Sequence, residues 1–128
     1  MSVNDVAKGL VDKCRQGDFM GAVEEFYADD IVSVEPVGND QMPAEIHGKD
    51  GVRGKNQWFA DNMEVHGLEV DGPFVAEDGK FAVRYTMDVT DKNTGQRIQM
   101  TEMALYTVKD DKIAREQFFY NPGPQAQA

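Results

Sequence analysis

The sequence has little that would anchor it to a membrane or cross-link it. It contains a single cysteine, Cys14, so no disulfide can form within the chain and packing alone must hold the fold together. No stretch approaches the roughly 18 consecutive apolar residues of a membrane span. Residues 1–9 lack the basic start and apolar core of a signal sequence. We therefore expect a cytoplasmic protein with no membrane partner.

Basic residues are also scarce, and recognisable cofactor motifs are missing. The 13 Lys and Arg against 23 Asp and Glu give a net charge of −10, which repels phosphate backbones, so we expect no nucleic-acid partner. The two histidines, His47 and His66, have no third ligand at a metal-site spacing. Gly48, Gly51 and Gly54 lack the spacing of a dinucleotide-binding loop. The sequence thus predicts neither a metal nor a cofactor.

What the sequence does contain is a pattern of helices followed by strands. Apolar residues at three- and four-residue intervals predict a first helix that begins at the capping pair Ser2 and Asp5 and ends at Gly17. Asp18 caps a second, shorter apolar stripe, and a third helix is expected over 50–63. Cys14 lies on the apolar stripe of the first helix, where a small core residue is the expected role.

Segments rich in β-branched and alternating residues complete the chain. Residues 31–37 predict a short strand that ends in a loop over 38–43, and four longer strands are expected over 64–76, 80–91, 96–109 and 112–120. Short turn sequences separate these four strands, so they should pair as an antiparallel meander. A chain of 128 residues fits one domain, which we expect to span 1–121 and to be followed by a flexible tail over 122–128.

Three short motifs carry a resemblance to a known family. They are FYADD at 26–30, VEPVG at 34–38 and HGK at 47–49, and the segment DKI at 111–113 resembles the family's closing hairpin. The chain is thereby similar to the steroid isomerase branch of the SnoaL-like and ketosteroid-isomerase-like proteins, a superfamily also called nuclear transport factor 2-like or cystatin-like. The resemblance implies an α+β cone, in which a strongly curved, mainly antiparallel sheet wraps around three N-terminal helices and encloses a pocket.

The resemblance also implies a catalytic carboxylate at Glu35, in the place of the isomerase's general base. A carboxylate that faces an apolar cavity has its charged form disfavoured, which moves its pKa toward a value useful for proton transfer. The isomerase's two oxyanion donors are not matched, because Leu10 and either Met103 or Ala104 stand at their positions. A glutamate at a strand end can instead be merely solvated, and this alternative stays open.

Two further glutamates, Glu102 and Glu116, share the alternation of pocket-lining positions on the last strands and are further catalytic candidates. Two carboxyl groups that face each other in an apolar pocket would divide the roles of acid and base. The alternative is an ordinary cross-strand pair with an arginine, at Arg84, Arg97 or Arg115. An epoxide-hydrolase arrangement built on Arg84 and Asp88 also stays open.

Apolar and amide side chains complete the predicted pocket. Asn56 on the third helix is expected to orient a substrate oxygen. The other predicted substrate-binding residues are Trp58, Phe59, Met63, Phe74, Tyr85, Met87, Phe118 and Tyr120. Such residues also form plain core, so they favour a pocket without requiring a ligand.

Together these features predict a protein that binds a small apolar, carbonyl-bearing molecule, with cofactor-free isomerase, cyclase or dehydratase chemistry at Glu35. One alternative is a module that binds a ligand or a protein without proton transfer, which the missing oxyanion donors favour. The other is a structural domain that forms a homodimer through the outer face of its sheet.

Overall fold

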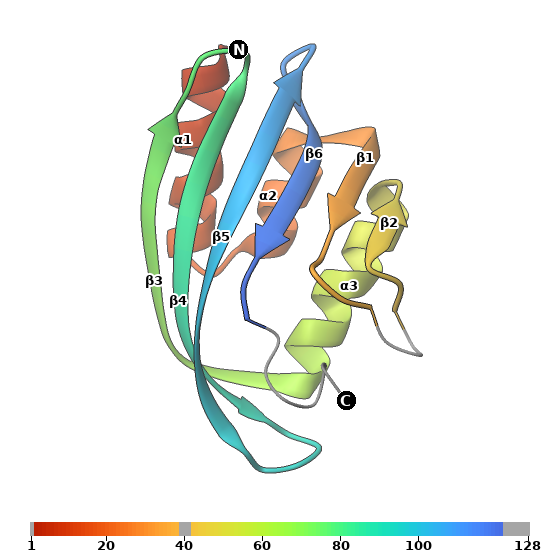
Figure 1. Cartoon of the computed structure of the whole chain (residues 1–128), viewed down its shortest axis with the longest axis vertical. Helices are drawn as coiled ribbons and strands as arrows, with labels where there is room; N and C mark the ends of the chain where they lie inside the picture. The colour runs from red at the N-terminus through yellow and green to blue at the C-terminus, as the bar shows by residue number, and fades with distance from the viewer. Residues whose placement is uncertain (1, 39–41, 122–128) are drawn as a thin grey trace.

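Three helices lie against one side of a curved six-stranded sheet in the computed structural model, which describes residues 2–38 and 42–121 (Figure 1). The predicted tail over 122–128 and part of the loop over 38–43 lie outside the described residues. The elements are α1 (Val3–Arg15), α2 (Phe19–Phe26), β1 (Tyr27–Val34), β2 (Glu45–His47), α3 (Lys49–Asn62), β3 (Met63–Val75), β4 (Lys80–Asp91), β5 (Arg97–Lys109) and β6 (Lys112–Phe119). The predicted α+β cone is confirmed.

The first two helices begin where the sequence predicts, because each has its own local signals. At the start of α1, the Ser2 hydroxyl accepts a hydrogen bond from the Asp5 N–H over 3.2 Å, and the Asp5 carboxylate accepts one from the Ser2 N–H over 3.1 Å. The Asp18 carboxylate caps α2 by accepting from the Gly21 N–H. The buried side of α1 is the predicted apolar stripe, and it includes Cys14.

The sheet joins the two halves of the chain. Its strand order is β2-β1-β6-β5-β4-β3, and β3 to β6 pair as the predicted antiparallel meander. β1 pairs in parallel with β6, with Ser33 opposite Glu116, and it pairs antiparallel with the short strand β2. The sequence predicted neither this parallel pairing nor β2, and β1 begins at Tyr27 rather than at residue 31. The parallel pair brings side chains of the first strand beside those of the last.

The two faces of the sheet differ in polarity, as the alternation in β4 predicts. Alternate side chains from Phe81 to Val89 are buried on the face that the helices cover. Arg84 and Asp88 occupy the other positions and point to the outer face. The epoxide-hydrolase arrangement is therefore wrong, because its two residues do not face the interior of the cone.

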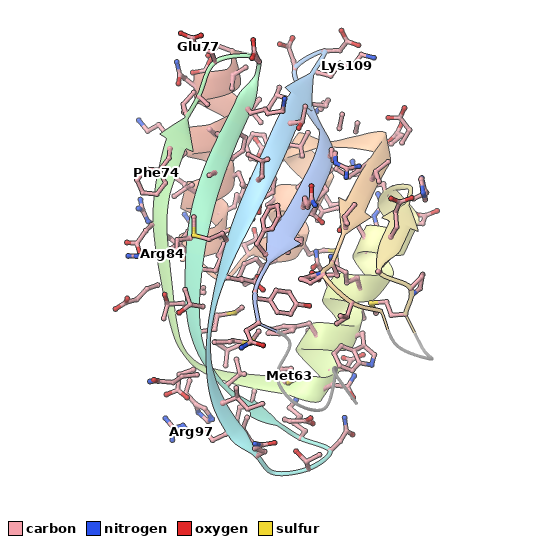
Figure 2. The ribbon with its side chains drawn as sticks, viewed as in Figure 1. Met63, Phe74, Glu77, Arg84, Arg97 and Lys109 are labelled. Atoms are coloured by element: carbon pink, nitrogen blue, oxygen red, sulfur yellow. The ribbon has the colours of Figure 1, made fainter. Side chains whose placement is uncertain are left out.

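Two of the three arginines predicted as partners of the late-strand glutamates bind aspartates on the outer face instead. Arg84 pairs with Asp71 and Arg97 pairs with Asp88, each over 2.7 Å. Figure 2 shows both arginines lying outside the sheet. The predicted arginine pairing is wrong, because none of the described ion pairs joins an arginine to either of the two late-strand glutamates.

The hydrophobic core fills the end of the cone beside α1, which packs against β3 and β4. Leu10 and Ala104 are fully buried in this core. Met103, the other match for one of the isomerase's donors, is 39% exposed. None of these three residues carries a side-chain hydrogen-bond donor of the kind that the isomerase uses. The opposite end of the cone lies under α3, and there the interior is open.

Candidate functional site

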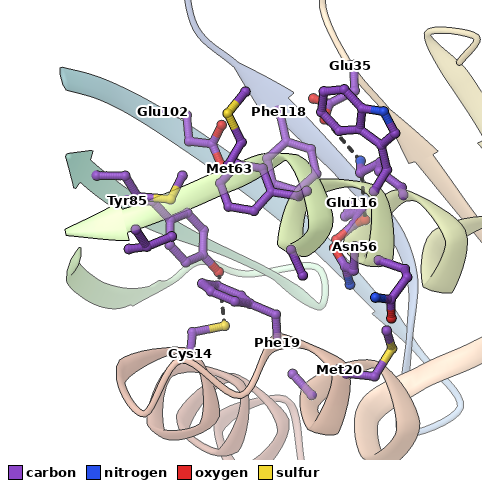
Figure 3. Close-up of a pocket in the computed structure, with 18 of the residues that line it drawn as sticks. Cys14, Phe19, Met20, Glu35, Asn56, Met63, Tyr85, Glu102, Glu116 and Phe118 are labelled. Atoms are coloured by element: carbon purple, nitrogen blue, oxygen red, sulfur yellow. Dashed lines mark hydrogen bonds and ion pairs between the residues drawn. The ribbon is translucent and has the colours of Figure 1, made fainter. Parts of the chain in front are cut away.

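A cavity of about 600 Å³ lies between α2, α3 and the inner face of the sheet (Figure 3). Its walls are largely apolar, with Phe19 and Met20 from α2, Trp58 and Phe59 from α3, and Met87 among the residues from the sheet. A cavity of this volume and lining is typical of sites for small organic molecules.

The cone brings together all but one of the predicted site residues. The lining of the cavity includes Glu35, Glu102, Glu116, Asn56, Trp58, Phe59, Met63, Tyr85, Met87, Phe118 and Tyr120. They come from α3, from the segments after β1 and β6, and from the inner faces of β3 to β6. Their roles stay predictions, but their convergence at one cavity is an observed feature of the structure.

Phe74 is the exception, and its prediction as a substrate-binding residue is wrong. Its side chain is 58% exposed, it does not line the cavity, and Figure 2 shows it at the outer edge of β3. The pairing of β3 with β4 shifts register between Asp71 and Phe74. Such an irregularity reverses which side chains face inward, so alternation counted from the middle of β3 fails beyond it.

Glu116 lies at the closed end of the cavity and is 2% exposed. The Tyr27 hydroxyl donates a hydrogen bond to Glu116 Oε1, and the Ser33 hydroxyl donates to Glu116 Oε2 over 2.7 Å. Both carboxyl oxygens thus have a partner from β1, which the parallel pairing of β1 with β6 places there. Glu116 thus ties the two strands together, and its catalytic role stays a prediction.

Lys55 on α3 is a site residue that the sequence analysis missed. Its ammonium group donates to Ser33 Oγ over 2.7 Å and pairs with Glu35 Oε1 at 3.1 Å. It also lies 3.9 Å from Glu116 Oε2 and 4.5 Å from the centre of the Phe118 ring, a cation–π distance. Its side chain is 13% exposed. The cavity therefore holds a largely buried positive charge with two acidic neighbours.

Helical spacing could have indicated Lys55. The predicted third helix places Val52, Lys55, Asn56 and Phe59 at intervals of three and four, so Lys55 shares the inward side that was assigned to Asn56. A lysine on an apolar stripe needs an acidic partner. Its partners come from strands that are distant in the sequence, and this is why spacing alone did not identify the cluster.

Glu35 follows β1 directly and is held at the cavity by its backbone, whose N–H donates to the Ala44 carbonyl over 2.8 Å. Burial raises the pKa of Glu35, and the positive charge of Lys55 opposes that rise. Glu35 Oε2 is buried and has no hydrogen-bond partner in the described structure. The Tyr120 hydroxyl lies close enough to the same carboxyl group to lower the pKa of Glu35 by hydrogen bonding. One oxygen of Glu35 is thus paired and the other is available.

Glu102 reaches the cavity from β5, opposite Tyr85 of β4 (Figure 3). Burial raises its pKa to about 7, and the negative charge of Glu35 adds to the rise while Lys55 opposes it. Among the described residues it has no hydrogen-bond or ion-pair partner. A carboxyl group with this pKa exists in both protonation states near neutral pH.

A second polar chain lies on the wall nearest to α1. The Tyr85 and Tyr106 hydroxyls are 2.7 Å apart, and Cys14 Sγ lies 3.5 Å from the Tyr85 hydroxyl. Burial raises the pKa of Cys14 to about 11 and those of the two tyrosines well above their ordinary values. These groups stay neutral at physiological pH. Cys14 is a buried wall residue and not a nucleophile, in keeping with its predicted place in the core.

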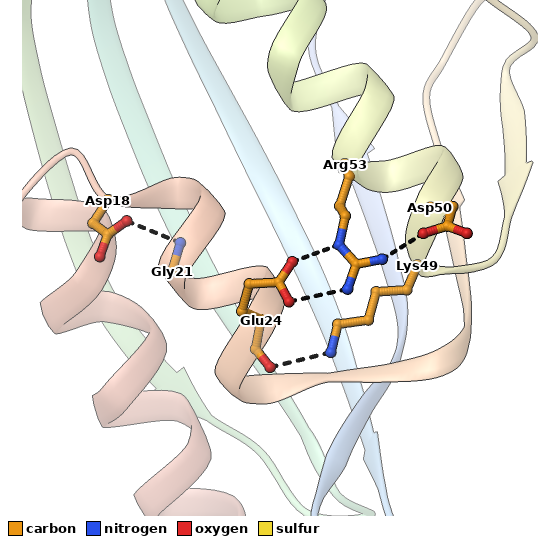
Figure 4. Close-up of polar contacts among 6 residues, drawn as sticks. All are labelled: Asp18, Gly21, Glu24, Lys49, Asp50 and Arg53. Atoms are coloured by element: carbon orange, nitrogen blue, oxygen red, sulfur yellow. Dashed lines mark hydrogen bonds and ion pairs between the residues drawn. The ribbon is translucent and has the colours of Figure 1, made fainter.

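Ion pairs on the outside of the molecule hold α3, and with it Lys55, against α2 (Figure 4). The Arg53 guanidinium donates to both carboxylate oxygens of Glu24, with one contact at 3.0 Å, and also to Asp50. The Lys49 ammonium donates to the Glu24 carbonyl oxygen over 3.1 Å. Arg53 thus makes a bidentate contact with Glu24 between the two helices, which is the geometry that arginine favours with carboxylates.

Arg53→Ala is expected to lower the melting temperature by no more than about 4 °C in dilute buffer, because exposed ion pairs contribute little. The loss should shrink in high salt, since salt screens exposed charges. Thermal melts in low and high salt check this, with Arg97→Ala, which removes an outer-face pair between β4 and β5, as the matched control. A loss of equal size at both salt concentrations would show that Arg53 acts through packing instead.

Neither a metal cluster nor a membrane span is found in the described residues. No group of three or more His, Cys, Asp or Glu side chains in this part of the chain is placed to hold a metal ion. No helix within 2–38 and 42–121 is long and apolar enough to cross a membrane.

Comparisons with known proteins agree with the fold. A family model described as the SnoaL-like domain matches residues 1–120. A Mesorhizobium loti structure, named as a candidate SnoaL-like polyketide cyclase and labelled carbohydrate phosphatase, shares 46% sequence identity, with 94% of this chain and 100% of that chain covered and a TM-score of 0.87. No curated protein matches.

More distant structures share the fold alone. A candidate isomerase from Bacillus subtilis is 15% identical, with 95% of this chain and 91% of that chain covered and a TM-score of 0.77. A Xanthomonas campestris protein of unknown function with a cystatin-like fold is 17% identical, with 99% and 95% covered and a TM-score of 0.76. The match over residues 1–120 and the 46% identity to the Mesorhizobium loti protein show that this chain belongs to the SnoaL-like family.

Proposed function

We propose that the chain binds a small apolar molecule with a carbonyl group and moves a proton on that molecule without a cofactor. The observation that carries the proposal is a pair of carboxyl groups, Glu35 and Glu102, in one largely apolar cavity, with the pKa of each raised by burial. Carboxyl groups tuned in this way serve as acids and bases near neutral pH. Isomerisation, cyclisation and dehydration are the reactions that such a pair can catalyse.

The surroundings of the two carboxyl groups indicate which one acts as the base and which as the acid. Glu35 pairs with Lys55, which favours its charged form, so Glu35 is the base. Glu102 has no cationic partner within hydrogen-bond reach and a pKa of about 7, so it is the group that holds a proton and acts as the acid. Asn56, on the α3 wall of the same cavity, is the amide that orients a substrate oxygen.

The names of relatives agree with proton-transfer chemistry on a carbonyl compound. The 46% identical Mesorhizobium loti protein is named a candidate polyketide cyclase. Its second label, carbohydrate phosphatase, does not suit this cavity, because Glu35 and Glu116 outnumber Lys55, the one cation among the described lining residues, and would repel a phosphate ester.

A non-catalytic role is the second candidate, and two observations favour it. Leu10 and either Met103 or Ala104 stand where the resemblance places the isomerase's oxyanion donors, and none of these side chains can act as such a donor. Met103 and Phe119 are adjacent across β5 and β6 and are 39% and 49% exposed on the outer face. Such a patch supports the homodimer expected from the sequence, which light scattering on the purified protein measures directly.

Wild type and Glu35→Gln are expected to bind the same ketones, but the variant should exchange a ketone's α-protons at least about 100-fold more slowly, because a positioned general base contributes about 10²–10⁴-fold. Bicyclic ketones such as 2-tetralone are suitable probes. Nuclear magnetic resonance in deuterium oxide follows the exchange. Thermal-shift titration follows binding, which stabilises the protein by about 2.7 kcal/mol at a ligand concentration of about 100 Kd.

Glu69→Gln, an exposed change on β3 outside the cavity, is the matched control and should behave as wild type. Binding without exchange by wild type would favour the non-catalytic module. Equal exchange by wild type and Glu35→Gln would exclude Glu35 as the base. An absence of both binding and exchange with every ketone would reject the proposal.

A further inference from the structure

Lys55 carries the one positive charge among the described residues that line the cavity. Proton removal beside a carbonyl group leaves a negative oxygen, and enzymes stabilise that oxygen with preorganised donors or cations. The two donor positions of the related isomerases are apolar in this chain, at Leu10 and at Ala104 or Met103. A different group must therefore take this role if the cavity performs such chemistry.

We propose that Lys55 stabilises the oxyanion that forms when Glu35 removes a proton from the substrate. This inference rests on the proposed function, and it identifies the group that stabilises the negative oxygen while Glu35 acts as the base. In the step, the C–H bond beside the carbonyl breaks and Glu35 gains the proton. The electron pair moves to the carbonyl oxygen and an enolate forms. Glu102 then donates its proton to another carbon, and exchange with solvent returns both carboxyl groups to their starting protonation states. No oxidant or co-reactant is consumed.

The two carboxyl oxygens of Glu35 have different surroundings: one contacts Lys55 and the other can accept a proton. Oε1 lies 3.1 Å from the Lys55 ammonium, whereas Oε2 is buried without a hydrogen-bond partner in the described structure. Oε2 is thus the atom free to accept a proton from a ligand. When it does so, Glu35 loses its negative charge and attracts Lys55 less strongly. The negative charge reappears on the substrate oxygen in the same cavity, so Lys55 exchanges one anionic partner for another.

The remaining partners of Lys55 hold it in place during this exchange. Ser33 Oγ accepts from the ammonium group over 2.7 Å and donates to Glu116 Oε2 over 2.7 Å. Glu116 Oε2 itself lies 3.9 Å from the ammonium nitrogen, and the Phe118 ring lies beneath it. The positive charge therefore stays compensated when Glu35 is neutral, which a buried cation requires. Ser33 and Glu116 are positioning residues, since they act through Lys55.

Lys55→Met is expected to lower kcat for ketone α-proton exchange by about 10²–10³-fold, the range for loss of one oxyanion-stabilising group, with KM changed far less. Lys55→Arg, which keeps the charge, should recover part of the rate. Lys8→Met removes an exposed lysine from α1, outside the cavity, and should keep the wild-type rate. Unchanged kcat in Lys55→Met, with exchange still lost in Glu35→Gln, would overturn the role of Lys55 and leave the proposed function standing.

A spectroscopic measurement tests the charge directly and does not depend on turnover. Phenols imitate the enolate, and their absorption distinguishes the ionised from the neutral form. In Glu35→Gln the anionic competitor is gone, so Lys55 should bind added 4-nitrophenol as the phenolate at a pH below its solution pKa. In the Glu35→Gln/Lys55→Met double variant, which removes both charges of the pair and so limits the risk of unfolding, the bound phenol should be neutral. An equal ionised fraction in both variants would overturn the inference.

Discussion

Glu102→Gln is expected to stabilise the folded protein by about 3 kcal/mol at about pH 8 and to change its stability little at about pH 4. Burial and the negative charge of Glu35 raise the pKa of Glu102 to about 7, against an ordinary value of 4.5. Ionised Glu102 therefore destabilises the fold. Glutamine has nearly the same shape and cannot ionise, so the variant avoids this destabilisation.

The pH window follows from the two pKa values. Since the folded-state value is the higher one, the unfolded chain releases the Glu102 proton first as the pH rises. The free energy of unfolding of wild type should fall between about pH 4.5 and about pH 7 through this group, and the contribution should level off above that range. Below the window Glu102 is protonated in both states, and the two proteins should differ little.

Denaturant unfolding of wild type and Glu102→Gln across this pH range measures the difference. The matched control is Glu69→Gln on β3, an exposed glutamate outside the cavity. A difference between wild type and Glu102→Gln that is the same at every pH would mean that the substitution acts through shape. It would also remove the reason for assigning Glu102 as the acid in the proposed function.

Features with local signals were predicted well from the sequence. The capping residues Ser2 and Asp18 mark the helix starts within their own turns, and the alternation along β4 identifies its inner face. Glu35 was found through a local motif around it. Each of these predictions depends on residues that are close in the sequence, where spacing determines which side chains share a face.

Features that depend on distant partners were missed. The parallel pairing of β1 with β6 spans most of the chain, and it places Tyr27 and Ser33 against Glu116. Without that pairing, the link from Lys55 through Ser33 to Glu116 is not visible in the sequence. The prediction for Phe74 was wrong for a local reason. A bulge within β3, which the sequence pattern did not indicate, reverses the alternation of inward and outward side chains.

Glu116→Ala is expected to lower the free energy of unfolding by about 3–5 kcal/mol, the usual result of removing one member of a buried charged pair. The Tyr27 and Ser33 hydroxyls would lose their acceptor, and Lys55 would lose one of its two anionic neighbours. Glu116→Gln should also destabilise strongly, since an amide restores the volume but offers one acceptor oxygen in place of two and no charge. Denaturant unfolding measures both variants.

A double-mutant cycle separates the charge interaction from the loss of volume. If Lys55 and Glu116 form one network through Ser33, then Lys55→Met/Glu116→Gln should cost less than the sum of the two single changes, by about 1–3 kcal/mol. The first substitution already breaks the network, so the second has less left to disrupt. The control cycle pairs Glu116→Gln with Lys8→Met, which removes an exposed lysine of α1 outside the cavity, and it should be additive. Additivity in both cycles would mean that Glu116 stabilises the sheet through β1 alone and does not hold Lys55 in place.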